Sequence, residues 1–468
     1  MKIILINPSW RFVYGQFKPA AKEGANMPPL GLTYIAAYLR SNGYRDIKIV
    51  DVEAGGYNID DIVEYSPDVI GFTSVTPNFE STCRMASELK KRLDIPLVLG
   101  GIHVSVAPVS AMENEKAFDY GVMGEGEVTA KELMDAIKEG KSVENIKGIV
   151  RRKQGKIIVN PPRELIRDLD VLPFPARELL NNSDYVFSVP GEGIRPLAMM
   201  SSSRGCPFNC VFCASKTIWG RGTRFRSAEN VLSEIEEIVN KLRIKYIVFS
   251  DDTFTLDRKR VVEICDLIIE RKLKFKWQMM TRANLFDEEL LLLMKKAGLV
   301  RMSIGIESGD PIILKKIKKG VTLQDIRDAY RIAAKVGVET RGSVMLGHPY
   351  ETRKTAMTTL RFIRNLKDCK QMYINISTPY PGTELYEMAI RGEGGLVMHT
   401  LDFSEFRRYG NAVVDVNDLT RKDLIHLQKL GFWMFYMTPS RIFYNLFRSG
   451  IVPGLKNVIA FLKSLTGR

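Results

Sequence analysis

Short apolar segments alternate with amphipathic stretches along the first third of the chain. Each apolar run ends at or just before Gly, Asn, Asp or Thr, which is typical of buried strands. Stretches such as LTYIAAYLRSNG and ESTCRMASELKKRL lie between them and have helical periodicity. We therefore expect an α/β domain with a parallel, doubly wound sheet, in which a ligand lies at the carboxyl ends of the strands. The strand candidates are residues 2–6, 46–51, 68–73, 96–101 and 119–124.

The alternation restarts after a segment rich in Pro and charge, ELIRDLDVLPFPARELL. Further apolar runs, with helical segments between them, favour a six-stranded parallel barrel or half-barrel of the TIM type. Each run ends in polar residues or Gly, at the position where such a barrel carries its chemistry. The six runs are PLAMMSS, KYIVFSDD, FKWQMMT, LVRMSIGIES, TRGSVMLG and MYINISTPY.

This pattern divides the 468 residues into four parts, because a chain of this length exceeds one ordinary domain. We expect a Rossmann-like domain at 1–145, a linker at 146–195, the barrel at 196–395, and a helical, basic and apolar region at 396–468. No uncharged apolar run reaches 18 residues, which argues against a transmembrane helix. The start, MKIILINPSW, is typical of a strand and too short in its apolar part for a signal peptide.

Cysteine usage and charge narrow the class further. Six cysteines are too few for a disulfide framework, so we expect a reducing, cytoplasmic location, with Cys83, Cys265 and Cys369 as buried structural thiols. The net charge of +14, from 68 basic and 54 acidic residues, suits nucleic acid, an anionic substrate or a membrane surface. No acidic residue follows Asp423, so the excess of positive charge is concentrated at the end of the chain.

Three cysteines, Cys206, Cys210 and Cys213, lie close together after the first strand of the expected barrel, in SSRGCPFNCVFCAS. Three thiolates at this spacing suit one face of an iron–sulfur cluster and leave one iron open, because no fourth cysteine is near. A zinc site completed by a distant histidine is the alternative. All four histidines are remote in sequence.

The C-x3-C-x2-C spacing, with aromatic Phe212 before the last cysteine, resembles the radical S-adenosylmethionine (SAM) superfamily. The resemblance implies that the three cysteines bind a [4Fe-4S] cluster whose open iron chelates SAM, with Phe212 beside the adenine. One-electron reduction, by a donor such as ferredoxin or flavodoxin, then cleaves SAM to a 5′-deoxyadenosyl radical that abstracts hydrogen.

Polar residues at later strand ends are further candidates for cofactor binding. Asp251 and Asp252 end the second strand, where the family has an acidic motif near the methionine ammonium, and a solvated turn is the alternative. Arg282, in TRAN, suits a cofactor carboxylate or a structural surface pair. Glu307 and Ser308, in SIGIESGD, resemble the family's ribose- and methionine-binding segment, although a βα turn would have the same pattern.

Two residues are candidates for catalysis. His348 in VMLGHPYET and Tyr380 in STPYPGTELY lie in segments similar to strand-end loops of this branch of the family. A turn histidine and a structural aromatic residue are the alternatives.

Paired glycines mark the N-terminal domain, in GGIHVSVAP and GEGE, and they let a large planar ligand or a phosphate approach the backbone. A dinucleotide site is disfavoured because ILINPSW stands where G-x-G-x-x-G would follow the first strand. With MPPLGLTYIAAYLRSNGY and GFTSVTPNFEST, these segments resemble the cobalamin-binding domain fused ahead of radical SAM barrels. The residues implied are Thr73, Gly100, Gly101, His103, Ser105, Gly124, Glu125 and Gly126.

One motif of classical cobalamin methyltransferases, Asp-x-His-x-x-Gly, is absent from the sequence. Its histidine coordinates cobalt, so we expect cobalamin with its own base displaced and no histidine below cobalt. His103 is then expected to fix its loop, or an edge of the cofactor, by hydrogen bonds.

The leading hypothesis is methylation of an unactivated carbon of a hydrophobic substrate. The substrate radical would take a methyl group from methylcobalamin, which a second SAM would restore. Radical ring closure, carbon–carbon coupling or rearrangement without methyl transfer is the alternative. A more distant alternative is a nucleic-acid-binding protein with a structural cluster, and the absence of an RNA-binding signature in the sequence argues against it. For the C-terminal region we expect helices that pack on the barrel edge. The alternative is a segment that lies in a membrane interface at the cytoplasmic face, in which case we expect a lipid substrate.

Overall fold

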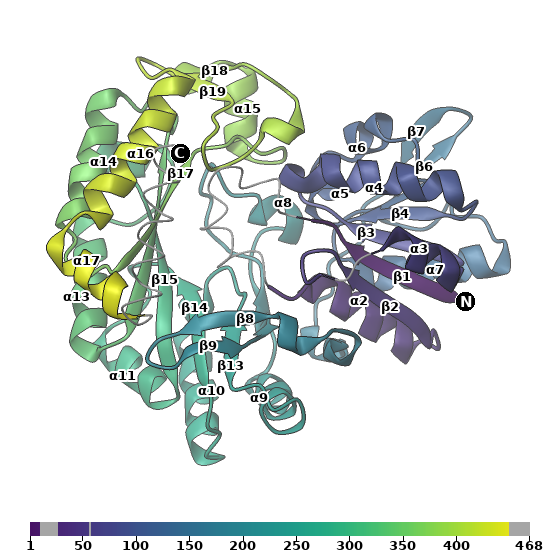
Figure 1. Cartoon of the computed structure of the whole chain (residues 1–468), viewed down its shortest axis with the longest axis horizontal. Helices are drawn as coiled ribbons and strands as arrows, with labels where there is room; N and C mark the ends of the chain where they lie inside the picture. The colour runs from purple at the N-terminus through teal and green to yellow at the C-terminus, as the bar shows by residue number, and fades with distance from the viewer. Residues whose placement is uncertain (10–26, 56–57, 449–468) are drawn as a thin grey trace. The chain divides into compact units, whose positions relative to one another are not determined.

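The computed structural model describes residues 1–9, 27–55 and 58–448, and the chain forms two compact units (Figure 1). Among these residues the first unit comprises the chain up to Tyr185 together with Thr217–Gly220, and the second comprises the rest. Each unit has its own parallel sheet, which confirms the expected fold class.

The first unit contains a seven-stranded sheet in the order β2-β1-β3-β4-β5-β6-β7, whose first five strands are parallel. The strand order reverses between β1 and β3, so the loops that follow these two strands diverge and leave a ligand site at the carboxyl edge. These strands are β1 (Lys2–Asn7), β2 (Asp46–Asp51), β3 (Val69–Thr73), β4 (Leu97–Gly100) and β5 (Tyr120–Val122).

Helices cover both faces of this sheet, as in a doubly wound domain. Helices α2 (Leu30–Ser41) and α7 (Gly126–Glu139) pack together over a core that includes Ile3 and Leu5. Ile4 and Ile6 point to the opposite face and are equally buried. The remaining helices are α3 (Ile59–Tyr65), α4 (Phe79–Arg92), α5 (Ile102–Val106) and α6 (Pro108–Asn114).

The first unit extends past the predicted boundary at residue 145. Strands β6 (Ile149–Lys153) and β7 (Lys156–Val159) add an antiparallel hairpin to the edge at β5. The segment up to residue 185 packs on the same unit, because Ala176 joins its core and the Tyr185 hydroxyl donates to Asp51 at 2.8 Å. Most of the segment predicted as a linker, 146–195, therefore belongs to the first unit. The pattern of Pro and charged residues concealed buried residues such as Ala176 and Tyr185.

The second unit contains a six-stranded parallel sheet in the order β10-β13-β14-β15-β16-β17. All six strands predicted from the apolar runs are present. Among the described strands β10 and β17 do not pair, so the sheet is an open half-barrel. The strands are β10 (Ala198–Met200), β13 (Tyr246–Phe249), β14 (Lys276–Thr281), β15 (Leu299–Glu307), β16 (Glu339–Leu346) and β17 (Gln371–Ile376).

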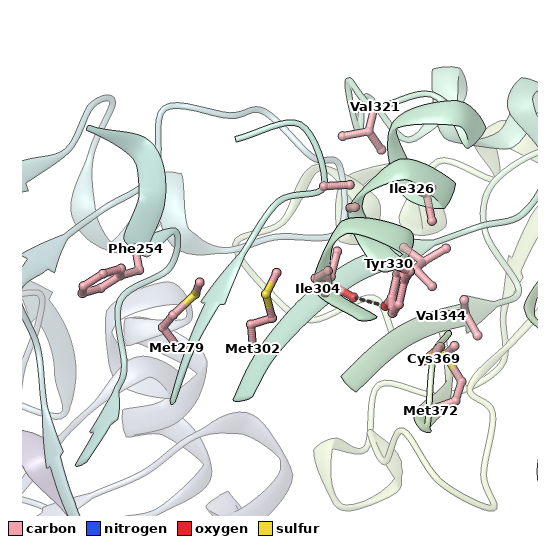
Figure 2. Close-up of a cluster of buried hydrophobic side chains, with 14 of the residues drawn as sticks. Phe254, Met279, Met302, Ile304, Val321, Ile326, Tyr330, Val344, Cys369 and Met372 are labelled. Atoms are coloured by element: carbon pink, nitrogen blue, oxygen red, sulfur yellow. Dashed lines mark hydrogen bonds between the residues drawn. The ribbon is translucent and has the colours of Figure 1, made fainter. Parts of the chain in front are cut away.

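Alternate residues of these strands face a layer of helices. Figure 2 shows Met279, Met302 and Ile304 in one buried cluster with Tyr330, whose hydroxyl donates to the Ile304 carbonyl at 3.3 Å. The residues between them point to the inner face, where the chemistry of a barrel takes place. The helices are α9 (Ala228–Glu236), α10 (Arg258–Glu270), α11 (Glu288–Lys296), α12 (Pro311–Lys316), α13 (Leu323–Val336), α14 (Arg353–Asn365) and α15 (Glu384–Ile390).

The C-terminal region is only partly helical, in contrast to the prediction from residue 396 onward. It begins with an antiparallel pair, β18 (Leu396–Met398) and β19 (Val414–Val416), and helix α16 (Arg421–Tyr436) follows. Helix α16 packs on β17 and α14, so it covers the edge strand of the half-barrel. Helix α17 (Pro439–Arg448) comes next. Within the described ranges no helix is both long and apolar enough to cross a membrane.

Candidate cofactor sites

The three clustered cysteines lie in the loop that follows β10, between β11 (Ser203–Arg204) and α8 (Ser215–Trp219). Two distant segments anchor the middle of this loop. The Val211 N–H donates to the Ile317 carbonyl at 3.2 Å, and the Leu385 N–H donates to the Val211 carbonyl at 2.8 Å. Both backbone polar groups of Val211 are therefore bonded to other parts of the chain, which fixes the middle of the loop.

Each cysteine sulfur contacts a different residue of the second unit. Cys206 lies 3.7 Å from the Thr253 hydroxyl, and Cys213 accepts the Ser215 N–H at 3.5 Å. Cys210 accepts a hydrogen bond from Arg282 at 3.6 Å. None of these thiols forms a disulfide, so all three are free to act as ligands.

The arrangement fits a cluster better than a single ion. Desolvation, and then the nearby Asp252, Cys210 and Cys206, raise the pKa of the Cys213 thiol to about 11, so the cysteines are electrostatic neighbours. In the described part of the chain, no three His, Cys, Asp or Glu side chains converge on one metal position. Each thiolate of a cubane binds a different iron, so convergence is not required, whereas a zinc site requires it.

The paired aspartates after β13 differ in environment. Asp251 is 1% exposed and accepts hydrogen bonds from the Ser202 N–H at 3.1 Å, the Ser202 hydroxyl at 2.6 Å and the Ser203 hydroxyl. It therefore fixes the segment that leads into the cysteine loop. Asp252 accepts from Ser215 at 2.5 Å, and desolvation raises the pKa of its carboxyl. Of the pair, Asp251 is buried and Asp252 is exposed, so Asp252 is the more accessible carboxylate.

Glu307 and Ser308 turn in different directions at the end of β15. Glu307 has a φ of +67° and accepts from the Lys319 ammonium at 2.9 Å, in a nearly buried ion pair. Ser308 is fully buried, and its hydroxyl lies 3.1 Å from that of Thr359 on α14, so it faces the helical layer. The Glu307 side chain fills the space beside Gly305, which explains the absence of a side chain there.

His348 and Tyr380 are both held by backbone groups. His348 is fully buried, its Nε2 lies 3.3 Å from the Glu307 carbonyl, and burial lowers its pKa to about 4. A neutral, enclosed imidazole is poorly placed to exchange protons with a substrate. Its ring centroid lies 5.9 Å from that of Phe212, which brings these two predicted site residues together. The Tyr380 hydroxyl donates to the Phe406 carbonyl at 3.1 Å and so anchors the segment before β19.

Glycines form a narrow cradle at the carboxyl ends of β3 and β4 in the first unit. Gly101 has a φ of +95°, and a Cβ there would lie 2.5 Å from the Ser74 carbonyl oxygen and 2.8 Å from the Thr73 hydroxyl. A Cβ on Gly100 would meet the Phe72 carbonyl at 3.3 Å. Gly101 is required here because the Ser74 backbone and the Thr73 hydroxyl occupy the space of a side chain, and Gly100 leaves little room for one.

Ser105 joins the two glycine loops. Its hydroxyl donates to the Gly101 carbonyl at 2.8 Å and accepts the Gly124 N–H at 2.9 Å. Gly126 begins helix α7, where a Cβ would lie 3.0 Å from Ile35. The predicted glycines and Ser105 therefore meet at one edge of the sheet.

His103 and Glu125 are committed to the protein. His103 lies on α5 and is fully buried, with Nδ1 3.1 Å from the Thr76 hydroxyl and its ring centroid 4.1 Å from that of Phe79. Burial lowers the pKa of His103 to about 4. Glu125 is 7% exposed and accepts the Ile166 N–H at 2.8 Å, so it ties down the segment after β7.

Sequence reasoning missed two residues beside the cysteine loop. Lys319 occurs in KKIKKG, a run that composition alone assigns to a solvated surface, yet it is 6% exposed and pairs with Glu307. The ring of Phe208 lies 3.7 Å from the Arg282 guanidinium carbon. The position of Phe208 between Cys206 and Cys210 is the sequence feature that could have marked it as a site residue.

The fold and these sites define the class of protein. Residues 200–363 match the family model of the radical SAM superfamily, and residues 19–134 match that of the B12 binding domain. In chain order, a doubly wound domain with a glycine cradle is followed by an open parallel half-barrel with a three-cysteine loop after its first strand. The chain is therefore a radical SAM enzyme with a cobalamin-binding domain, and its cofactors are a [4Fe-4S] cluster, SAM and cobalamin.

Similar proteins support this assignment along nearly the whole chain. An uncharacterized methyltransferase of Pyrococcus horikoshii is 34% identical over 96% of this chain and 95% of its own length. An anaerobic magnesium-protoporphyrin IX monomethyl ester cyclase of Rubrivivax gelatinosus is 28% identical over 95% of this chain and 79% of its own. A hopanoid C-2 methylase of Rhodopseudomonas palustris is 27% identical over 85% of this chain and 71% of its own length. The chain belongs to the family of radical SAM proteins that carry a B12-binding domain.

A solved structure has the same architecture. The radical SAM methyltransferase TsrM of Kitasatospora setae, with cobalamin and a [4Fe-4S] cluster bound, covers 100% of both chains with a TM-score of 0.74. At 18% identity the likeness concerns the fold.

Proposed function

We propose that this enzyme transfers a methyl group to an unactivated carbon of a mainly apolar substrate. The observation that carries the proposal is that one chain bears both the glycine cradle after β4 and the three-cysteine loop after β10. When bound, SAM at the cluster supplies a hydrogen-abstracting radical and cobalamin supplies the methyl group. The methyltransferase and the methylase among the relatives support this direction.

The residues have distinct roles in this proposal. Cys206, Cys210 and Cys213 hold the cluster, and Asp252 attracts the ammonium of SAM by opposite charge. Phe212 packs on the adenine. Asp251 shapes the loop without touching a cofactor.

The inner face of the half-barrel supports an apolar substrate with a hydrogen-bond donor. Met280, one residue before the end of β14, is 46% exposed, although its neighbours Met279 and Thr281 are buried. The Asn375 amide nitrogen donates to the Ser343 hydroxyl at 3.2 Å, and its oxygen has no partner among the described residues. A buried acceptor of this kind suits a substrate hydroxyl or N–H, because an unsatisfied polar atom costs about 1–3 kcal/mol.

The test is anaerobic reconstitution with SAM and a one-electron reductant, with and without cobalamin, on extracts of the source cells. We expect a base-off cobalamin spectrum and a product 14 mass units heavier, which becomes labelled from methyl-deuterated SAM. Omission of cobalamin should remove the methylated product while 5′-deoxyadenosine still forms, since SAM cleavage needs only the second unit. A product that gains no label, or that forms equally without cobalamin, would favour ring closure or coupling, the activity class of the cyclase relative.

We further propose that the C-terminal helices touch a membrane surface, in keeping with a hopanoid methylase among the relatives. Trp433 on α16 is 56% exposed and Phe443 on α17 is 63% exposed, and no acidic residue follows Asp423. Exposed aromatic residues with basic neighbours favour an interface with anionic lipid. However, Arg441 is buried and donates to five backbone carbonyls, those of Ile363, Arg364, Leu366, Cys369 and Phe435.

This burial determines the design of the membrane test. Deletion from residue 431 would remove Phe435 and Arg441, which are packed inside, so a surface variant is required. We expect the intact protein to sediment with anionic vesicles at low salt, and Trp433→Ser with Phe443→Ser to reduce the bound fraction at least fivefold. Ile312→Ser, at an exposed apolar position on α12, is the matched control. Equal sedimentation of the double variant and the intact protein would count against a membrane contact through these helices.

A further inference from the structure

Arg282 is a buried cation beside the cysteine loop. It follows β14 directly, and the residue is 5% exposed. No carboxylate among the described residues forms an ion pair with it. Burying an unpaired charge costs on the order of several kcal/mol, because the charged group loses its hydration. The missing negative partner must therefore come from something that binds at this position.

The guanidinium is fixed before any cofactor arrives. One Nη donates to the Lys319 carbonyl, and the guanidinium carbon lies 3.7 Å from the centroid of the Phe208 ring. The Lys319 segment is itself held, because the ammonium of Lys319 pairs with Glu307 at 2.9 Å and the preceding Ile317 carbonyl accepts from Val211. Arg282 is thus positioned by two segments, the cysteine loop through Phe208 and the Lys319 segment, which Glu307 and Val211 hold in turn.

Another donor of Arg282 contacts the cysteine loop. Its other Nη donates to the Cys210 sulfur at 3.6 Å, and its Nε is buried without a partner among the described residues. The Lys319 charge is already balanced by Glu307. Arg282 is consequently a cation in direct contact with the Cys210 sulfur, with no carboxylate paired to it among the described residues.

We propose that Arg282 is a positioning residue that raises the reduction potential of the [4Fe-4S] cluster through its charge and its N–H···S bond to Cys210. Reduction adds one electron to a cluster already carrying three thiolates, so a nearby cation stabilises the reduced form more than the oxidised form. Hydrogen bonds to cluster sulfurs and local net charge are established determinants of these potentials. Phe208 and the Lys319 carbonyl hold the guanidinium in place, and the charge of the cluster balances Arg282 in return.

A competing role is an ion pair between Arg282 and the SAM carboxylate. The two roles differ in the absence of SAM, because a clamp for SAM leaves the potential of the SAM-free cluster unchanged. The test is therefore an electron paramagnetic resonance redox titration of the reconstituted full-length protein without SAM, cobalamin or substrate. Iron and sulfide per chain are measured first, so that only cluster-replete samples are compared.

We expect Arg282→Gln to lower the SAM-free potential by at least 59 mV, a tenfold loss in the one-electron reduction equilibrium. Arg282→Lys should lower it less, since an ammonium keeps the charge but loses the planar fork. Arg258→Gln is the matched control, because Arg258 is exposed and pairs with Asp287 and Glu289. Its potential should equal that of the unchanged protein.

The proposal is overturned if cluster-replete Arg282→Gln has the potential of the unchanged protein. If that variant fails to hold a cluster, Arg282→Lys and Phe208→Leu decide the matter. Phe208→Leu removes the ring that fixes the guanidinium without altering charge, and we expect a downward shift in both. Unchanged potentials in both variants would assign Arg282 to SAM alone.

Discussion

Replacing Cys206, Cys210 and Cys213 together by Ala is expected to reduce 5′-deoxyadenosine formation to the level of a protein-free control. The three thiols lie in one loop and form no disulfide, and Cys213 is an electrostatic neighbour of Cys206, Cys210 and Asp252. Without them no iron site remains at which SAM can be reduced. Liquid chromatography with mass spectrometry measures the nucleoside, and iron and sulfide analysis measures the cluster.

Cys265→Ala supplies a matched control for this experiment. Cys265 is a fully buried thiol on α10 within the hydrophobic core of the same unit, and burial raises its pKa. We expect this variant to keep its iron, its sulfide and its nucleoside production, with a modest loss of stability from the small cavity. Full nucleoside production by the triple variant would refute the cluster assignment.

Asp251→Ala is expected to lower the free energy of unfolding of the apoprotein by about 3 kcal/mol and to reduce the iron bound after reconstitution. The substitution leaves the Ser202 N–H and the hydroxyls of Ser202 and Ser203 without their common acceptor, in a fully buried place. Each buried donor left unsatisfied costs about 1–3 kcal/mol, although relaxation recovers part of the sum. Denaturant unfolding and iron analysis provide the two measurements.

Asp252→Ala is the control at the adjacent residue, and it should affect SAM affinity more than stability. Its carboxylate accepts from Ser215 and is not part of the Ser202–Ser203 arrangement, so we expect a stability loss below about 1 kcal/mol. SAM affinity should fall about tenfold, because a charge-assisted contact to the ammonium is lost. Calorimetric titration with SAM checks this. Equal effects of the two substitutions on stability would contradict the division of roles.

The sequence by itself determined the two sheets and the kinds of cofactor. Runs such as KIILI and KYIVFSDD carry the strand period, and the turn residues after them mark the carboxyl ends, since both signals are local. The C-x3-C-x2-C spacing is also local, because all three ligands lie within eight residues of one loop. Gly100 and Gly101 were predicted to let a ligand approach the backbone, and in the structure the close approach at Gly101 is that of Thr73 and Ser74.

Only the tertiary structure decided which polar residues are committed to contacts within the protein. Asp251 and Asp252 are identical in type and adjacent in sequence, but Ser202 and Ser203 bury the first, and they lie about 50 positions away. Lys319 belongs to a lysine-rich run that composition assigns to solvent, yet it is buried and pairs with Glu307. Arg441 lies in the basic tail, and its guanidinium is buried against distant carbonyls such as that of Leu366. The first unit likewise extends to Tyr185, because that hydroxyl meets Asp51 across 134 residues. Burial and hydrogen-bond partners depend on contacts between segments far apart in the chain, and a local pattern does not contain them.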